Sequence, residues 1–482
     1  MDNNIDSVPA DRCPVDHTAP AAPASAAARP AIPATDLPKV QLSTLRQLFE
    51  YWRRPPGFLE ECRRRYGSRF AVSIRLPPKP VYLLTDTADI KQLFTAPADV
   101  LHTGNGSISI EKYTGGSGLA WLDEDEHKVR RRLLMPSMNG KALRRIEASV
   151  NELADRAVAT WPRGRAIELH PLIHRYSLQS IGEVIFGELP SNFDEILEVM
   201  TDMMRFNDHI MSVVPIHKLP RPLFMLLEAI RPVGLHDFLT LRARADELIA
   251  QAIAERRSSG ELGDDMLSVL LGITHEDGSP LSGTELRDEM MTIFIAGVET
   301  TAAAITWALE YLSREPAVVE RLVSEIDAGT DDTYLMATIH ELLRLRPSLS
   351  QIIPREVMKP IEIGGVRYEP GMILWGSAYL MNRDPDLYED PDVFRPERFL
   401  GAKPGTYTWI PFGGGRIRCL GDKVAILEMK ALLRAVLTQC ELRRSDSEPA
   451  GARSRIVVVL PEKRGRLELR SRRRSATTAV AG

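Results

Sequence analysis

The chain has 482 residues, with 61 basic and 65 acidic side chains and a formal net charge of −4. Such a balanced charge gives no electrostatic argument for nucleic-acid binding, so we expect no nucleic-acid partner. The four cysteines form no CxxC pair. This pattern excludes a disulfide scaffold and favours a reducing cytoplasm.

The N-terminal segment, residues 1–38, is rich in Ala and Pro and has almost nothing to bury. We therefore expect a disordered tail there. Pro, Ser, Arg and Asp interrupt it, whereas a membrane anchor needs about 20 consecutive apolar residues, so no anchor is expected. No repeat or linker divides residues 39–470, which predicts a single catalytic domain, and residues 471–482 read as a basic flexible tail.

The globular pattern starts with strand signals. The stretch Phe70 to Leu84 alternates and is rich in Val, Ile and Tyr, which predicts a small sheet. Between Lys141 and Glu325 nearly every segment has helical periodicity, with Pro and Gly at the breaks. Strand signals return after Pro354, at Ile361 to Arg367 and at Arg455 to Leu460. The fold class is therefore mainly α with small β-sheets (α+β).

One long helix stands out. A capping box, Ser282 to Glu285, precedes a helical pattern that continues to Pro316, giving about 30 residues and roughly 45 Å. Met290 to Leu309 carries a single charge, Glu299, so a membrane span must be considered. Placing an unpartnered carboxylate in lipid costs several kcal/mol of free energy. A helix buried in the protein core therefore explains this apolar run better than a membrane span.

Inside this helix the run Ala296-Gly297-Val298-Glu299-Thr300-Thr301 combines a helix-weakening glycine, an acid and two hydroxyls. Packing alone would favour Leu or Ala at such positions. The run therefore predicts a functional site, and the alternative is a helix that merely bends at its glycine.

The segment Pro411 to Gly421 reads PFGGGRIRCLG and precedes a helical pattern. Its glycines permit turns that leave Cys419 at a loop-to-helix junction, where free N–H groups and the helix N-terminus stabilise a thiolate. We expect Arg416 and Arg418 to lower the pKa of Cys419 further. A zinc site lacks nearby ligands, and Arg418 breaks the GxGxxG phosphate pattern. A nucleophilic cysteine and a buried structural cysteine stay open.

These residues resemble the cytochrome P450 superfamily, whose haem-binding signature has a Phe, a Gly, a Cys and a Gly in register with Phe412, Gly415, Cys419 and Gly421. The order of further motifs supports the resemblance. Glu341-Leu342-Leu343-Arg344 resembles the family's ExxR motif, and Phe394 to Phe399 resembles its PERF segment. By resemblance Arg398 completes a buried network with Glu341 and Arg344.

The resemblance implies iron protoporphyrin IX (haem b) as cofactor, with Cys419 as its metal ligand. The other cofactor-binding residues that it implies are Phe412, Gly415, Arg418, Gly421, His127, Arg131, Arg355, Ala296 and Gly297. His127, Arg131 and Arg355 resemble the cations that bind the haem propionates. One departure is Ile417, because the family usually has a basic residue two positions before the cysteine.

The resemblance also implies a haem-thiolate monooxygenase that activates O2, with Thr300 as the hydroxyl on the oxygen side and Glu299 as the acid that feeds protons inward. The pocket is expected to draw on His102 to Leu119, on Phe294, Ile295 and Ala296, and on Ser348 to Ile353. These residues are mostly apolar or small. A hydrophobic substrate follows, such as a fatty acid, terpenoid, steroid or secondary metabolite.

No flavin, nicotinamide or iron–sulfur motif is present, so electrons are expected from a ferredoxin or flavodoxin with its NAD(P)H reductase. Cations on the cysteine side are expected to form the docking patch. They are Lys128, Arg130, Arg132, Arg416, Arg418 and Lys423. A merely solvated charged face is the alternative.

Three other functions stay open. A peroxide-using or oxidative-coupling haem enzyme would not need the electron partner. A haem-binding sensor would have no use for Glu299 and Thr300. His170 and His174 have the i, i+4 spacing of zinc ligands, but no HExxH glutamate accompanies them, and Pro171 suggests that a helix begins there.

Overall fold

The computed structural model describes residues 31–74, 79–104, 110–208, 225, 234–260, 262–329, 331–455 and 458–472. The α-helices are α1 (Thr44–Arg53), α2 (Pro55–Tyr66), α3 (Thr87–Thr95), α4 (Glu111–Thr114), α5 (Glu124–Leu134), α6 (Gly140–Thr160), α7 (His170–Phe186), α8 (Phe193–Met204), α10 (Leu235–Ser259), α11 (Met266–Leu271), α12 (Gly283–Leu312), α13 (Pro316–Ala328), α14 (Thr333–Leu345), α15 (Ala378–Met381) and α16 (Asp422–Gln439). The 3-10 helices are η1 (Ala34–Asp36), η3 (Met135–Met138), η4 (Arg205–Asp208), η7 (Pro396–Phe399) and η8 (Gly415–Ile417).

The strands are short. They are β1 (Ile32–Pro33), β2 (Arg69–Val72), β3 (Val81–Leu84), β4 (Leu101–His102), β5 (Ala166–Glu168), β6 (Arg355–Val357), β7 (Ile361–Ile363), β8 (Val366–Tyr368), β9 (Ile373–Gly376), β10 (Cys440–Arg444), β11 (Ala452–Arg455), β12 (Val458–Pro461) and β13 (Arg466–Ser471). The largest sheet has the order β2-β3-β9-β6-β4, in which only β3 and β9 run parallel. The expected class, mainly α with small sheets, is confirmed.

The two ends of the folded body differ from the sequence expectation. Ile32 pairs with Val366, and Ala34 is buried, so residues 31–38 belong to the fold rather than to a tail. At the other end Ser471 pairs with Cys440, and the N–H of Arg472 donates to the carbonyl of Gln439. Residues 1–30 and 473–482, where the tails were expected, lie outside the described residues.

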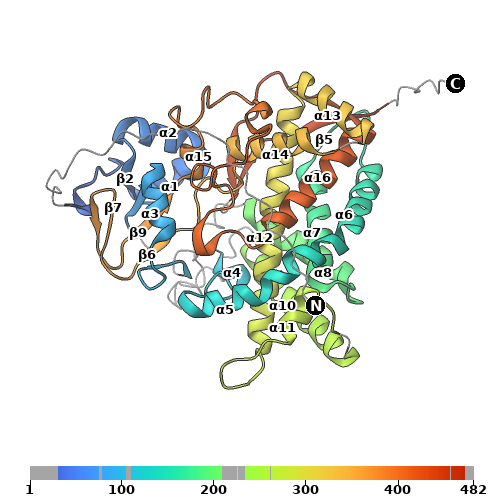
Figure 1. Cartoon of the computed structure of the whole chain (residues 1–482). Coiled ribbons are helices and arrows are strands. Elements are labelled where there is room, and N and C mark those ends of the chain that lie inside the picture. The colour runs from blue at the N-terminus through green and yellow to red at the C-terminus, as the bar shows by residue number, and fades with distance from the viewer. Residues whose placement is uncertain are drawn as a thin grey trace, which may run out of the picture.

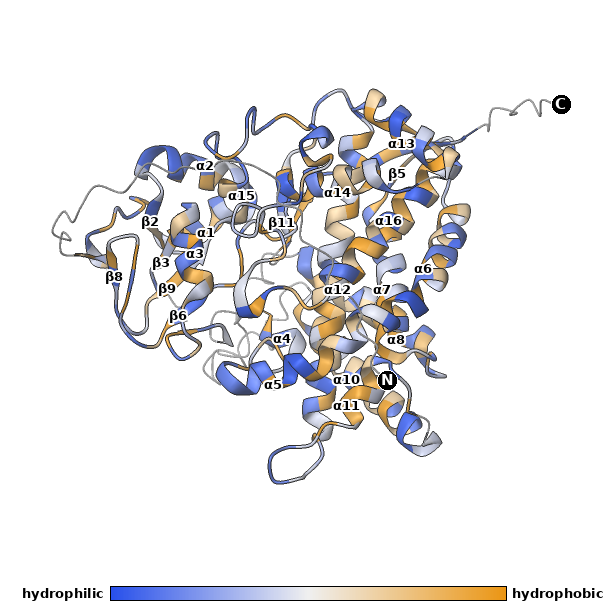
Figure 2. Ribbon diagram, in the orientation of Figure 1, coloured by the Kyte–Doolittle hydropathy of each residue, from blue (hydrophilic) through white to orange (hydrophobic). Residues whose placement is uncertain are grey.

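The molecule has a strand-rich side, which includes β2, β9 and α1 to α3, and a helical side built around α12, α7 and α16 (Figure 1). The apolar faces of these three helices meet in the helical side, and the more polar segments face outward (Figure 2). Burying apolar surface is the main stabilising contribution here, at about 25 cal/mol per Å². Most residues of the long helix α12 are buried, so this helix runs through the core and contributes much of that stabilisation.

Helix α12 begins as its capping box predicts. The Ser282 hydroxyl accepts from the N–H of Glu285 at 3.2 Å, and the Glu285 carboxylate accepts from the N–H of Ser282 at 2.9 Å. In the described part of the chain it is the one helix long and apolar enough to cross a membrane, and 83% of its apolar window is buried inside the protein. The preference for a core helix over a membrane span agrees with that burial.

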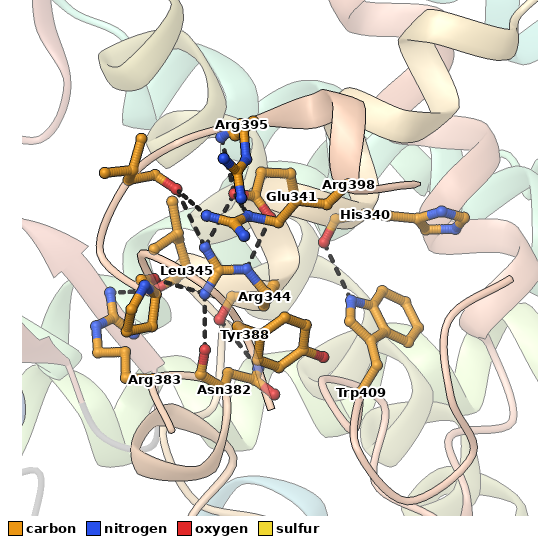
Figure 3. A network of polar contacts seen from close by, with 12 residues as sticks. His340, Glu341, Arg344, Leu345, Asn382, Arg383, Tyr388, Arg395, Arg398 and Trp409 are labelled. Atoms are coloured by element: carbon orange, nitrogen blue, oxygen red, sulfur yellow. Dashed lines mark hydrogen bonds and ion pairs between the residues drawn. The ribbon is translucent and has the colours of Figure 1, made fainter. Parts of the chain in front are cut away.

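A buried ionic network supports the loop that carries Cys419. The Arg344 guanidinium donates to both carboxylate oxygens of Glu341, at 2.7 and 2.9 Å, and Arg398 donates to Glu341 at 3.2 Å. Arg344 also donates to the carbonyls of Asn382 and Pro391 (Figure 3). The structure confirms the expected network, which ties α14 to η7 and to the chain leading into the cysteine loop.

Candidate functional site

A cavity of about 460 Å³ lies between α12 and the loop before α16. Its wall includes Cys419, Ala296, Gly297, Thr300 and the first turn of α16. Elements far apart in sequence meet there, because α5, β6 and the hairpin of β11 and β12 also contribute wall residues. The cavity is thus the place where most of the sequence-predicted site residues converge.

The cysteine loop depends on its glycines. Gly413 and Gly415 have φ values of 65° and 67°, a region that favours glycine. A Cβ on Gly415 would lie 2.3 Å from the carbonyl oxygen of Phe94, so the loop packs directly on the end of α3. The N–H of Cys419 donates to the carbonyl of Phe412 at 2.9 Å and closes the turn. The loop thereby presents Cys419 at the N-terminus of α16.

Cys419 lines the cavity, and the residue is exposed to that space. Burial raises the pKa of its thiol above the ordinary value, while the N–H of Gly421 and the charges of Arg131 and Arg418 act to lower it. The expectation that Arg416 also lowers this pKa is wrong. Its guanidinium turns away and donates to the backbone carbonyls of residues 96, 98 and 101.

Three basic residues line part of the cavity wall. They are His127 and Arg131, one turn apart on α5, and Arg355, the first residue of β6. Within the described chain, the Nε and Nη1 atoms of Arg355 have no hydrogen-bond partner, although the residue is 1% exposed. Burial and the charge of Arg416 lower the pKa of Arg355 to about 9. Burial, with the nearby arginines, lowers the pKa of His127 to about 4.

An unpaired buried cation is costly, so this cluster calls for an anionic partner. The dianionic propionate edge of a haem would supply that charge, and Cys419 on the same cavity would supply a sulfur ligand to its iron. Ile417, which stands where the family usually has a basic residue, lines the cavity and adds no charge there. The residues present therefore fit haem, because one cavity offers a cysteine sulfur together with two arginines and a histidine.

Helix α12 contributes a large part of the cavity wall. The Thr300 hydroxyl donates to the carbonyl of Ala296 at 2.7 Å, a back-bond that loosens helices locally. Ala296 is exposed to the cavity. A Cβ on Gly297 would come within 2.6 Å of the Ile181 side chain, so this glycine permits the close approach of α7. Phe294, predicted as a pocket residue, points away from the cavity and packs on Phe186.

Glu299 lines the cavity, and its carboxylate contacts side chains from α7 and β11. Its Oε1 lies 3.1 Å from Nε2 of His174 on α7, and its Oε2 lies 3.4 Å from Nη1 of Arg455 on β11. Sequence reasoning missed the roles of His174 and Arg455. The i, i+4 pair of histidines was a visible signal, whereas Arg455 gave none. No group of three or more metal-ligating side chains occurs among the described residues, which disfavours the zinc alternative.

The remaining predicted site residues have backbone or packing roles. Phe412 lines the cavity and packs edge-on against Trp409 at 5.9 Å. The N–H of Gly421 donates to Cys419. The φ of Gly421 is −95°, so this position does not need a glycine for its backbone conformation. Arg418 pairs with Asp422 at 2.9 Å on the first turn of α16. Together these contacts fix the cysteine loop against the helix.

A mainly α fold with a long core helix over a cavity-facing cysteine, and with a cation cluster beside it, defines a haem-thiolate protein. The sequence model of the cytochrome P450 family matches residues 38–469. The chain belongs to the cytochrome P450 family.

Known relatives agree. Cytochrome P450 135B1 of Mycobacterium tuberculosis is similar at 32% identity over 437 residues, which cover 88% of this chain and 89% of that one. Cytochrome P450 137 of the same organism is 34% identical over 427 residues, with 85% and 84% covered. The retinoic acid-bound cyanobacterial CYP120A1 structure has a TM-score of 0.77 at 22% identity and covers 92% of this chain and 100% of its own. The last likeness supports the fold alone.

Membership of this family makes the chain a haem-dependent monooxygenase, an oxidoreductase that uses O2, an organic substrate and electrons from a redox partner.

Proposed function

We propose that this protein binds haem b and inserts oxygen from O2 into a hydrophobic small organic molecule, in the cytoplasm, with electrons from a ferredoxin or flavodoxin served by an NAD(P)H reductase. The observation that carries the proposal is the convergence on one cavity of Cys419 and Arg355, whose buried Nε and Nη1 atoms have no hydrogen-bond partner among the described residues. When bound, haem ligated by a thiolate supplies O2 activation and heterolytic O–O cleavage.

The chain's own residues prepare the site for that chemistry. Cys419 would hold the iron, and His127, Arg131 and Arg355 would hold the propionates. Thr300 lines the cavity, and its hydroxyl would offer a hydrogen-bond group to O2. Glu299, the neighbouring acid, is the proposed source of protons for Thr300 and for water near it.

The cavity wall supports a hydrophobic substrate. Its lining is largely apolar, and the charged or basic exceptions are His127, Arg131, Glu289, Glu299, Arg355, Arg418 and Arg455. It extends from α12 to the N-terminal helix α1, whose Leu48, Tyr51 and Trp52 form part of the wall. Of the predicted stretch Ser348 to Ile353, all residues but Ser350 line the cavity. The predicted glycine-rich loop contributes Thr103, Ile110, Tyr113, Thr114 and Leu119. Residues 105–109 of that loop lie outside the described residues.

The partner surface is smaller than the sequence predicts. Arg130 is buried and pairs with Glu289 at 3.1 Å, and Arg416 is turned inward. Lys128 and Arg132 on α5 stay exposed, together with Lys423 on α16. The apolar side chains of α5 next to them, Val129 and Leu133, are 45% and 38% exposed. Cations around an apolar centre suit an acidic electron carrier.

The reduced, carbon monoxide-bound absorption spectrum tests the proposed cofactor chemistry. We expect the thiolate-type Soret band in the wild-type protein and its loss in Cys419→Ala. Cys440→Ala is the matched control, because Cys440 is buried on β10 away from the cavity. A Soret band that is unchanged in Cys419→Ala would overturn the assignment.

Substrate and partner need separate assays. Neutral apolar compounds should shift the Soret band, and a library in which only charged compounds shift it would refute the hydrophobic substrate.

The double variant Lys128→Glu and Arg132→Glu should slow reduction by an acidic ferredoxin about tenfold at low salt. The control variant is Lys463→Glu, an exposed lysine between β12 and β13. Equal rates in both variants would exclude the α5 surface.

A further inference from the structure

The carboxylate of Glu299 lies in a buried charge cluster that three elements build behind the cavity wall. Glu299 comes from α12, His170 and His174 come from α7, and Arg455 comes from β11, and all four are at most 8% exposed. Arg455 Nη1 lies 3.4 Å from both Glu299 Oε2 and His170 Nδ1, and its Nη2 donates to the carbonyl of Met204 at 2.8 Å. The cluster therefore fixes the guanidinium from several sides.

The cluster has an outer side. Arg455 Nε lies 3.2 Å from Asp208 Oδ1, and Asp208 Oδ2 accepts from Arg464 at 2.7 Å. The Asp208 side chain is 24% exposed and that of Arg464 is 38% exposed. The alternating charges of Glu299, Arg455, Asp208 and Arg464 thus lead from the cavity wall to solvent.

The histidine spacing that sequence alone associates with zinc has another use here. His174 directs Nε2 to the carboxylate of Glu299, and His170 faces the Arg455 guanidinium. Burial and the Arg455 charge hold the pKa of His170 well below its ordinary value, so that ring is neutral. The Arg455 guanidinium, 3.4 Å from His170, would repel a metal ion at this pair, and His174 contacts the acid on α12 instead.

The charges around Glu299 favour its ionised form. Burial alone would raise the pKa of Glu299, but Arg455 and the hydrogen bond from His174 outweigh burial and hold that pKa well below its ordinary value. Tyr113 on α4, the remaining titratable group that faces this acid, is itself buried and neutral. An acid held in this way carries no proton near pH 7 unless its partners release it.

We propose that Arg455 is a positioning residue that holds Glu299 charged and turned toward α7, so that the hairpin of β11 and β12 controls when this acid carries a proton. The inference rests on the proposed function, in which Glu299 supplies protons. The hairpin also lines the cavity through Ser454 and Val458. A substrate that packs against the hairpin therefore contacts the element that holds the acid.

Infrared spectroscopy of the haem-loaded protein between pH 5 and pH 8 tests this inference. The band of the protonated Glu299 carboxyl is identified by its loss when Glu299→Gln is added. We expect no such band in the wild-type protein and a titrating band in Arg455→Met, a change of more than tenfold in proton affinity. Arg455→Lys, which keeps the charge, should resemble the wild type. Arg314→Met is the control, because Arg314 pairs with Glu310 on α12 away from the cavity.

Either a Glu299 band in the wild-type protein or its absence from Arg455→Met would overturn the inference. If Arg455→Met does not fold, the double variant with Glu299→Gln decides. Recovery of the folded holoprotein supports the pairing, and failure shows that Arg455 serves the hairpin rather than the acid. The carbon monoxide spectrum tests Cys419 separately, so failure of this inference is distinguishable from failure of the proposed function.

Discussion

Glu428 on α16 provides a quantitative test of buried electrostatics in this fold. Its side chain is fully buried, and neither carboxylate oxygen accepts a hydrogen bond of good geometry from the described residues. Burial raises the pKa of Glu428 from 4.5 to about 8, although the hydroxyls of Ser180 and Ser177 on α7 act to lower it. The folded protein therefore holds this carboxyl neutral at pH 7, whereas the unfolded chain ionises it.

The sign of the pH effect follows from proton binding. Between pH 4.5 and about 8 the folded state binds a proton that the unfolded state has released, so stability falls as pH rises through this window. The slope is at most about 1.4 kcal/mol per pH unit. Glu428→Gln keeps the shape of the side chain and removes the ionisation. Relative to the wild type, the variant should gain on the order of 3 kcal/mol between pH 5.5 and pH 7.5.

Urea unfolding of the haem-loaded wild type and variant, at half-unit pH steps, measures this difference. Glu320→Gln is the control, because Glu320 is an exposed carboxylate on α13 and should leave the difference flat. A flat difference for Glu428→Gln would refute a neutral buried carboxyl. A difference that is flat in this window but changes below about pH 4.5 would mean that Glu428 is ionised and paired in the folded protein.

Three further substitutions test the supports of the site. Arg344→Met removes the charge that pairs with Glu341 and should lower the free energy of unfolding by about 3–5 kcal/mol in thermal denaturation, so wild-type stability would contradict a role for this network. Gly297→Ala should cost about 1–3 kcal/mol in urea because its Cβ meets Ile181, and Ile181→Val, which removes the nearest atom, should restore part of that loss; without this rescue the steric account is wrong. Ser282→Ala should cost about 1 kcal/mol by removing the cap of α12, and an unchanged midpoint would show that the cap adds nothing.

Local patterns made much of this protein predictable from its sequence. The capping box predicted the start of α12, because a cap is a contact between residues three apart. The pair Glu341 and Arg344 was predictable because i, i+3 places both side chains on one helix face. The glycines around Cys419 predicted a turn that only small residues allow.

Contacts between distant segments were decided by the tertiary structure. Arg130 and Arg416 read as exposed docking cations, but one pairs with Glu289 and the other donates to carbonyls after α3. Arg455 lies 156 residues beyond Glu299, and no spacing rule relates them. Local periodicity determines which face of a helix is apolar, whereas the partner of a buried charge depends on which elements the packed core brings together. The sequence alone therefore identified the cysteine and its class of chemistry, while packing decided how the acid on α12 is held.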